Sequence, residues 1–102
     1  MSYDNNNIFA KILRGEVPCD KIYEDEYVLS FYDVNPQKKI HALVIPKGKY
    51  TNLDDFNENA SEKEILGFFR GVTLVAKKLG ISINNGNGYR TLSNIGSDGG
   101  QE

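Results

Sequence analysis

The chain has 102 residues, a formal net charge of −2 and 39% hydrophobic residues. This length predicts one domain over residues 1–102, and the slightly acidic balance argues against a nucleic-acid partner, which requires a basic stripe. No apolar run approaches the roughly 20 residues that span a bilayer, and the single cysteine, Cys19, excludes an internal disulfide. We therefore expect a protein of the reducing cytoplasm without membrane contact.

The first half of the chain predicts a short helix followed by strands. Residues 1–7 are polar and are expected to be flexible. Residues 8–14 place apolar groups at i, i+1, i+4 and i+5 before Gly15 and Pro18, which predicts an amphipathic helix. Strands are predicted over residues 21–24, 27–33 and 40–45. The third strand is apolar on both faces, which predicts a place in the middle of the sheet with both sides covered.

A longer helix is predicted from Ser61, because Ser61-x-x-Glu64 is a capping box and Gly80 is placed to end the helix in a left-handed conformation. The predicted core stripe consists of Ile65, Phe69, Val72, Ala76 and Leu79, widened by Phe68 and Val75. The opposite side holds Gly67, Gly71 and Leu74. Each glycine inside a helix costs about 1 kcal/mol relative to alanine, so these positions are either simply tolerated or permit close approach of a partner chain.

A last strand is predicted at residues 89–94, after an Asn- and Gly-rich loop at residues 84–88. The order helix, three strands, helix, strand predicts an α+β fold with an antiparallel sheet and two helices.

Asp33 is the first candidate functional residue. It precedes Asn35-Pro36, so one interpretation is a turn residue that bonds its own backbone. The alternative is a carboxylate at a strand end that accepts hydrogen bonds from a ribose diol, with Phe31 and Val34 as apolar walls for a base.

His41 is the only histidine of the chain. Strand alternation places it on one face with Leu43 and Ile45, where a hydrogen-bonded core histidine is the commoner interpretation and a catalyst the rarer one. Cys19 and His41 together supply too few ligands for a structural zinc site, so no metal is expected.

Residues 96–101 read Gly-Ser-Asp-Gly-Gly-Gln. They predict either a plain turn or a concavity of backbone N–H groups that holds phosphate oxygens. The segment lacks the lysine of a P-loop, so it is no Walker motif.

Five segments together resemble one known family. They are Asn-Ile-Phe-Ala-Lys-Ile from residue 7, Ile-Tyr-Glu-Asp from 22, Phe-Tyr-Asp-Val-Asn-Pro-Gln from 31, His-Ala-Leu-Val-Ile-Pro-Lys from 41 and Asn-Ile-Gly-Ser-Asp-Gly-Gly-Gln from 94. In order and spacing they resemble the histidine triad (HIT) family of nucleotide hydrolases and transferases, in particular its nucleoside phosphoramidase branch. The resemblance covers residues 6–102.

The resemblance implies a homodimer that binds a purine nucleoside monophosphate moiety without a cofactor. The implied base pocket consists of Ile8, Phe9, Ile12, Phe31 and Val34. Asp33 would hold the ribose hydroxyls, with Tyr32 at a backbone-contact position, and the phosphate would face Asn94, Gly100 and Gln101. His41 matches a supporting histidine that precedes the triad. Relatives of this branch join their sheets through the strand corresponding to residues 89–94 and pack the helices corresponding to residues 61–79.

The resemblance also implies a catalytic mechanism, but the 102 residues do not contain the catalytic histidines that this mechanism needs. In the family, a His-x-His-x-His strand follows the glycine-rich turn, and its central histidine attacks the α-phosphorus. That triad strand is central in the sheet of relatives. We expect either a fragment of an enzyme or a remnant that binds without catalysing. Two function classes therefore stay open: a hydrolase of nucleoside phosphoramidates in the parent protein, and an inactive nucleotide-binding or interaction protein.

Overall fold

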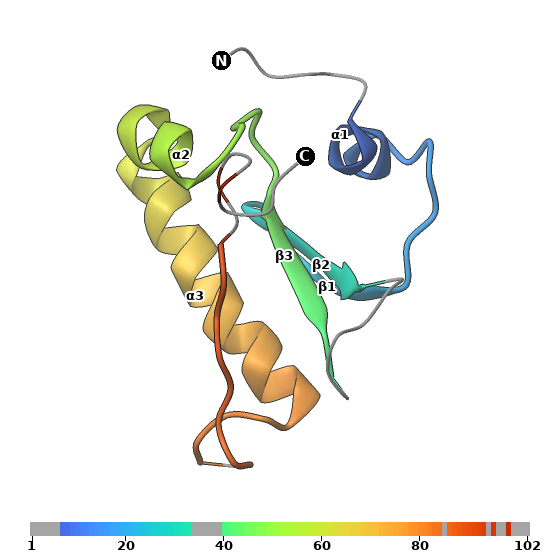
Figure 1. Ribbon diagram of the computed structural model, residues 1–102, viewed down its shortest axis with the longest axis vertical. Coiled ribbons are helices and arrows are strands. Elements are labelled where there is room, and N and C mark those ends of the chain that lie inside the picture. The colour runs from blue at the N-terminus through green and yellow to red at the C-terminus, as the bar shows by residue number, and fades with distance from the viewer. Residues whose placement is uncertain (1–6, 34–39, 85, 94, 96–97, 99–102) are drawn as a thin grey trace.

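The computed structural model describes residues 7–33, 40–84, 86–93, 95 and 98. Their helices are α1 (Ile8–Leu13), α2 (Leu53–Asn59) and α3 (Glu62–Leu79), and their strands are β1 (Lys21–Glu24), β2 (Val28–Tyr32) and β3 (Ala42–Pro46). The strands form an antiparallel sheet, with α3 beside it and α1 at the other side of the view (Figure 1). This confirms the predicted α+β class.

The two faces of β2 meet different helices. Val28 lies against Gly71 of α3, whereas Phe31 contacts the ring of Phe9 on α1. Successive side chains of a strand point to opposite faces, so α3 and α1 cover opposite faces of the sheet. Four consecutive residues of β2, 28–31, are buried, which makes this strand the centre of the core.

The strand order is β1-β2-β3, so β3 lies at an edge of the sheet that the described residues form. The predicted mid-sheet position for residues 40–45 is not seen among the described strands, and residues 42–46 of β3 are half-buried. β2 pairs with β1, which precedes it in the chain, and with β3, which follows it, so β2 is the central strand of the three. An apolar run indicates a strand, but it carries no information about the order of strands in the sheet.

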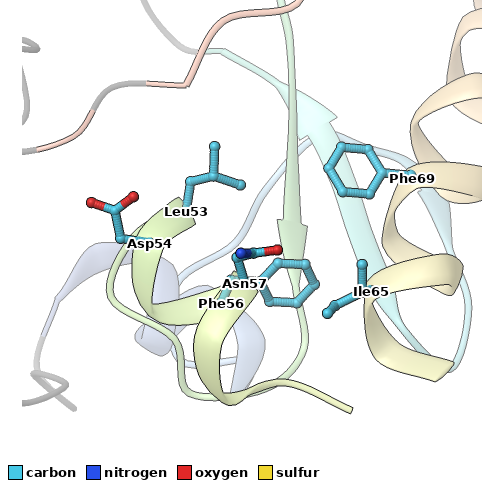
Figure 2. Close-up of a pocket in the computed structure, with 6 residues that line it drawn as sticks. All are labelled: Leu53, Asp54, Phe56, Asn57, Ile65 and Phe69. Atoms are coloured by element: carbon cyan, nitrogen blue, oxygen red, sulfur yellow. The ribbon is translucent and has the colours of Figure 1, made fainter. Parts of the chain in front are cut away.

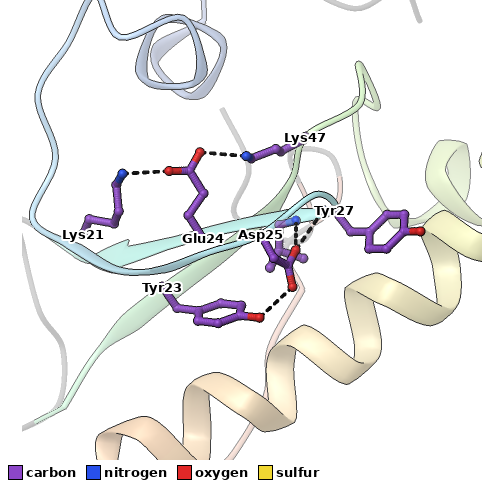
Figure 3. A network of polar contacts seen from close by, with 7 residues as sticks. Lys21, Tyr23, Glu24, Asp25, Tyr27 and Lys47 are labelled. Carbon is purple, nitrogen blue, oxygen red and sulfur yellow. Dashed lines mark hydrogen bonds and ion pairs between the residues drawn. The ribbon is translucent and has the colours of Figure 1, made fainter.

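Asp25 shapes the turn between β1 and β2 (Figure 3). Its Oδ1 accepts hydrogen bonds from the backbone N–H groups of Tyr27 at 2.8 Å and Val28 at 3.0 Å, and its Oδ2 accepts one from the Tyr23 hydroxyl at 2.8 Å. Burial raises the pKa of this carboxyl, but these hydrogen bonds outweigh burial and leave the pKa below its usual value. The turn therefore depends on an ionised Asp25.

Glu24 links β1 to the segment after β3. Its Oε1 lies 2.7 Å from Lys21 Nζ and its Oε2 lies 2.7 Å from Lys47 Nζ (Figure 3). The hydrogen bond from Lys21, followed by that from Lys47, lowers the pKa of Glu24 from 4.5 to about 2. The Glu24 carboxylate thus pairs with one lysine of β1 and with the lysine that directly follows β3.

Helix α3 begins and ends where the sequence predicts. Ser61 Oγ accepts a hydrogen bond from the Glu64 N–H at 3.2 Å, and Glu64 Oε1 accepts one from the Ser61 N–H at 3.2 Å. This confirms the capping box. Gly80 has φ 74°, in the left-handed region that glycine adopts most easily. Both signals involve groups within four residues of each other, which is why they can be recognised in the sequence.

The buried face of α3 agrees only in part with the predicted one, since Val75 and Ala76 are buried as predicted but Gly71 is buried as well. A Cβ atom at Gly71 would lie 2.8 Å from Val28 Cγ2, and a Cβ atom at Gly67 would overlap the ring of Tyr27. Phe69, predicted in the core stripe, is instead 52% exposed. The two glycines therefore permit close approach of the chain's own sheet, and do not lie on the side away from it.

Helix α2 is absent from the sequence prediction. Asn52 caps it, since its Oδ1 accepts a hydrogen bond from the Asp55 N–H at 2.9 Å, and acidic Asp54 and Asp55 occupy its first turn. An Asn cap followed by acidic residues is a helix-start signal that was present in the sequence. The helix contributes Phe56 to the core, with ring centroids 5.2 Å from both Tyr50 and Phe68.

Two predictions at the ends of the chain require correction. Asn7, expected in a flexible terminus, caps α1 through a hydrogen bond from the Ala10 N–H to its Oδ1 at 2.8 Å. Residues 88–93 form no strand, and most of them are exposed. A strand exists only through a ladder to a neighbour, and alternation of side chains provides no partner. Residues 1–6 and 94 lie outside the described part of the chain.

We predict that Gly71→Leu lowers the free energy of unfolding by about 1–3 kcal/mol, because added bulk must displace the fully buried Val28. The better helix propensity of leucine offsets only about 1 kcal/mol of this cost. Thr73→Leu, at an exposed position of the same helix, is the matched control. Urea denaturation of both variants measures the difference, and equal stability of Gly71→Leu and the wild type would contradict the packing described above.

The Glu24 ion pairs predict a defined pH dependence. Because the folded pKa is lowered to about 2, the stabilisation by Glu24 is complete above pH 4.5 and is lost as the pH falls towards 2. The stability difference between wild type and Glu24→Gln should therefore be largest above pH 4.5 and vanish near pH 2. Denaturation curves across this range measure it, with exposed Glu26→Gln as the control. A difference that is independent of pH would refute the assignment.

Candidate functional site

The candidate site lies where β2 ends and β3 begins. The Cα register pairs Tyr32 with Ala42, and the Asp33 N–H donates a hydrogen bond to the His41 carbonyl at 2.9 Å. The antiparallel ladder therefore continues by one residue on each side. It places Asp33 and His41 opposite each other, at the end of β2 and just before the start of β3.

The side chains of this pair also meet. His41 Nε2 lies 3.3 Å from Asp33 Oδ2, and the two side chains are 29% and 22% exposed. They are sheltered enough to hold a preferred geometry and open enough to meet a ligand. Sequence reasoning assigned separate roles to these residues and missed their contact. The signal that could have revealed it is the short connection between the two predicted strands, which favours antiparallel pairing.

Apolar groups lie on the same face of the sheet. Phe31 is buried two residues before Asp33, and its ring centroid lies 6.3 Å from that of Phe9 with an interplanar angle of 39°. Ile8 and Phe9 are exposed and Ile12 is half-buried, so α1 offers apolar surface beside Phe31. Alternation directs the exposed Tyr32 to the other face.

Four of the residues predicted to bind the nucleotide, Val34, Asn94, Gly100 and Gln101, lie outside the described residues. The structure thus brings Phe9, Phe31, Asp33 and His41 to neighbouring positions around one end of β2, with Ile8 and Ile12 on the adjoining helix.

Two hollows of the described surface lie away from this end of β2. One of about 290 Å³ lies between α2 and α3, as Figure 2 shows, and is lined by Leu53, Asp54, Phe56, Asn57, Ile65 and Phe69. A second, of about 400 Å³, lies over the glycine side of α3, with Leu66 and Leu74 on its wall. Neither contains a residue predicted to bind the nucleotide. The polar side chains of the first hollow, Asp54 and Asn57, offer no cation for phosphate.

Within the ranges that the structure covers, no group of three or more His, Cys, Asp or Glu side chains is placed to hold a metal ion. No helix there is both long enough and apolar enough to cross a membrane.

The fold and this site define a small α+β protein with a carboxylate and an imidazole at the end of two paired strands of an antiparallel sheet. The HIT domain matches residues 14–102. A 13.2 kDa HIT-like protein of Azospirillum brasilense is 54% identical over 101 residues, which cover 99% of this chain and 80% of the relative. A HIT-like protein of Helicobacter pylori is 46% identical over 98 residues, which cover 94% of this chain and 86% of the relative.

Solved structures of HIT family proteins have a fold similar to that of this chain. A histidine triad protein from Clostridium difficile superposes with a TM-score of 0.83 at 38% identity, over 97% of this chain and 83% of that one. A HIT family hydrolase from Legionella pneumophila superposes with a TM-score of 0.82 at 36% identity, over 95% of this chain and 83% of that one. The chain belongs to the HIT family.

Proposed function

We propose that this chain binds the purine nucleoside monophosphate moiety of phosphoramidates or related nucleotides, at the end of β2. The observation that carries the proposal is the half-buried Asp33 carboxylate, which follows the buried Phe31 and its Phe9 neighbour. A carboxylate accepts hydrogen bonds from the two hydroxyls of a ribose, and an apolar surface beside it suits a base. The similarity to HIT family hydrolases supports a hydrolase, and the nucleotide ligand is what the motif resemblance implies.

The reaction that we propose for a protein carrying these residues together with the triad motif is hydrolysis at the α-phosphate. A histidine nitrogen attacks the phosphorus while the bond from phosphorus to the leaving amine breaks, and the amine takes up a proton. Water then attacks the nucleotidyl-histidine and restores the free imidazole. Assignment to the phosphoramidase branch rests on the resemblance of the motifs.

The second candidate function is nucleotide binding without catalysis. Its supporting observation is that the 102 residues contain one histidine, and that His41 contacts Asp33. In this function His41 would orient the Asp33 carboxylate. Asp33, Phe31 and α1 would then form a binding surface that does not depend on the triad.

A homodimer and a cytoplasmic location complete the proposal. Both rest on the family resemblance and on composition. The glycines of α3 no longer argue for the dimer, because they pack within the chain.

Asp33→Asn should weaken binding of adenosine and guanosine monophosphates by about 1.5–3 kcal/mol, because the amide loses the charge that strengthens the hydrogen bonds to ribose. Calorimetric titration measures the affinities. Asp54→Asn, in the hollow between α2 and α3, is the matched control and should bind like the wild type. Equal affinity of Asp33→Asn and wild type would remove Asp33 from the site, and a wild type without affinity for either nucleotide would refute the binding function.

The 102-residue chain should release no nucleotide from adenosine 5′-phosphoramidate, since its 102 residues contain no His-x-His-x-His motif and His41 has no second histidine beside it. Chromatographic detection of adenosine monophosphate after prolonged incubation measures this. The control is the same preparation with His41→Ala. Turnover by the wild type that disappears in His41→Ala would make His41 a nucleophile and contradict the mechanism.

A further inference from the structure

Asp33 and His41 are joined twice. The backbone of Asp33 donates to the His41 carbonyl at 2.9 Å, and the Asp33 Oδ2 lies 3.3 Å from His41 Nε2. Residues opposite each other on antiparallel strands present their side chains on the same face of the sheet. The contact therefore follows from the β2–β3 register, which also pairs Phe31 with Leu43.

This contact restricts the carboxylate. The terminal torsion of an aspartate is broad, so a carboxylate without side-chain contacts samples many orientations of its plane. Contact with Nε2 at 3.3 Å favours those orientations that keep Oδ2 beside the imidazole. An ionised carboxylate has about four lone-pair sites on its two oxygens. Oδ2 can therefore face His41 and still, together with Oδ1, accept hydrogen bonds from a diol.

We propose that His41 is a positioning residue for ribose recognition: it holds the plane of the Asp33 carboxylate in the orientation that accepts both hydroxyls of a ribose. The inference rests on the proposed nucleotide-binding function. It assigns His41 a role within the binding site, separate from the support of the triad that the family resemblance implies. The consequence is selectivity for ribonucleotides over nucleotides that lack the diol.

The test compares adenosine monophosphate with 2′,3′-dideoxyadenosine monophosphate by calorimetric titration of the full chain. The variants are wild type, His41→Ala, Asp33→Asn and the double variant, with Ile40→Ala as a control for general damage at the start of β3. His41→Gln is the rescue variant, because its side-chain amide N–H reaches about as far as Nε2. If His41→Ala does not fold, His41→Asn, whose shorter amide does not reach Asp33, takes its place.

We expect His41→Ala to lose about five- to tenfold in affinity for the ribonucleotide, in the range of coupling between contacting residues, and to bind the dideoxynucleotide like the wild type. In the Asp33→Asn background, loss of His41 should change ribonucleotide affinity less than twofold, because the group through which it acts is already altered. His41→Gln should recover most of the affinity.

Two results would overturn the inference and leave the proposed function intact. One is an equal loss for both nucleotides in His41→Ala, which indicates general damage to the site. The other is a double variant whose loss is the product of the two single losses, which indicates independent action. If the wild type binds both nucleotides equally, ribose recognition by Asp33 fails and the inference with it, whereas a wild type that binds neither refutes the proposed function itself.

Discussion

Helix α3 approaches β2 so closely that a Cβ atom at Gly67 or Gly71 would meet the side chains of Tyr27 and Val28. This packing buries Val28 completely and makes β2 the centre of the core. The helix gives up about 1 kcal/mol of intrinsic stability at each glycine, and the burial of apolar surface against the sheet outweighs that cost.

The candidate site follows from the same arrangement. With α3 on one face of β2, the other face is left to α1, and Phe31 meets Phe9 there. The register of β2 with β3 then sets Asp33 opposite His41 at the rim of that face. The site thus combines an apolar surface, supplied by a helix and a strand, with a polar pair at the end of a ladder. It needs no long-range adjustment of the chain.

This division of labour suits recognition of a nucleoside. In the proposed complex the apolar surface would accommodate a base, and the carboxylate would distinguish sugars by their hydroxyls, since a polar group left without its partner costs about 1–3 kcal/mol. Catalysis in the HIT family requires different groups: a nucleophile that attacks the phosphorus and an acid that protonates the leaving group. The contacts of Phe31, Asp33 and His41 described above involve β2, the start of β3 and α1.

The sequence by itself determined the local features: the class of the fold, the strands around Ile22 and Phe31, and both ends of α3 at Ser61 and Gly80. The sequence also contains the start signal of α2, the Asn52 cap followed by acidic residues, although the helix was not predicted. These features depend on groups a few residues apart. The tertiary structure alone decided the central place of β2, the face of α3 that meets the sheet, the absence of a strand at 88–93 and the contact between Asp33 and His41. Each of these depends on which distant segment supplies the partner, and the periodicity of a single segment carries no information about its partner.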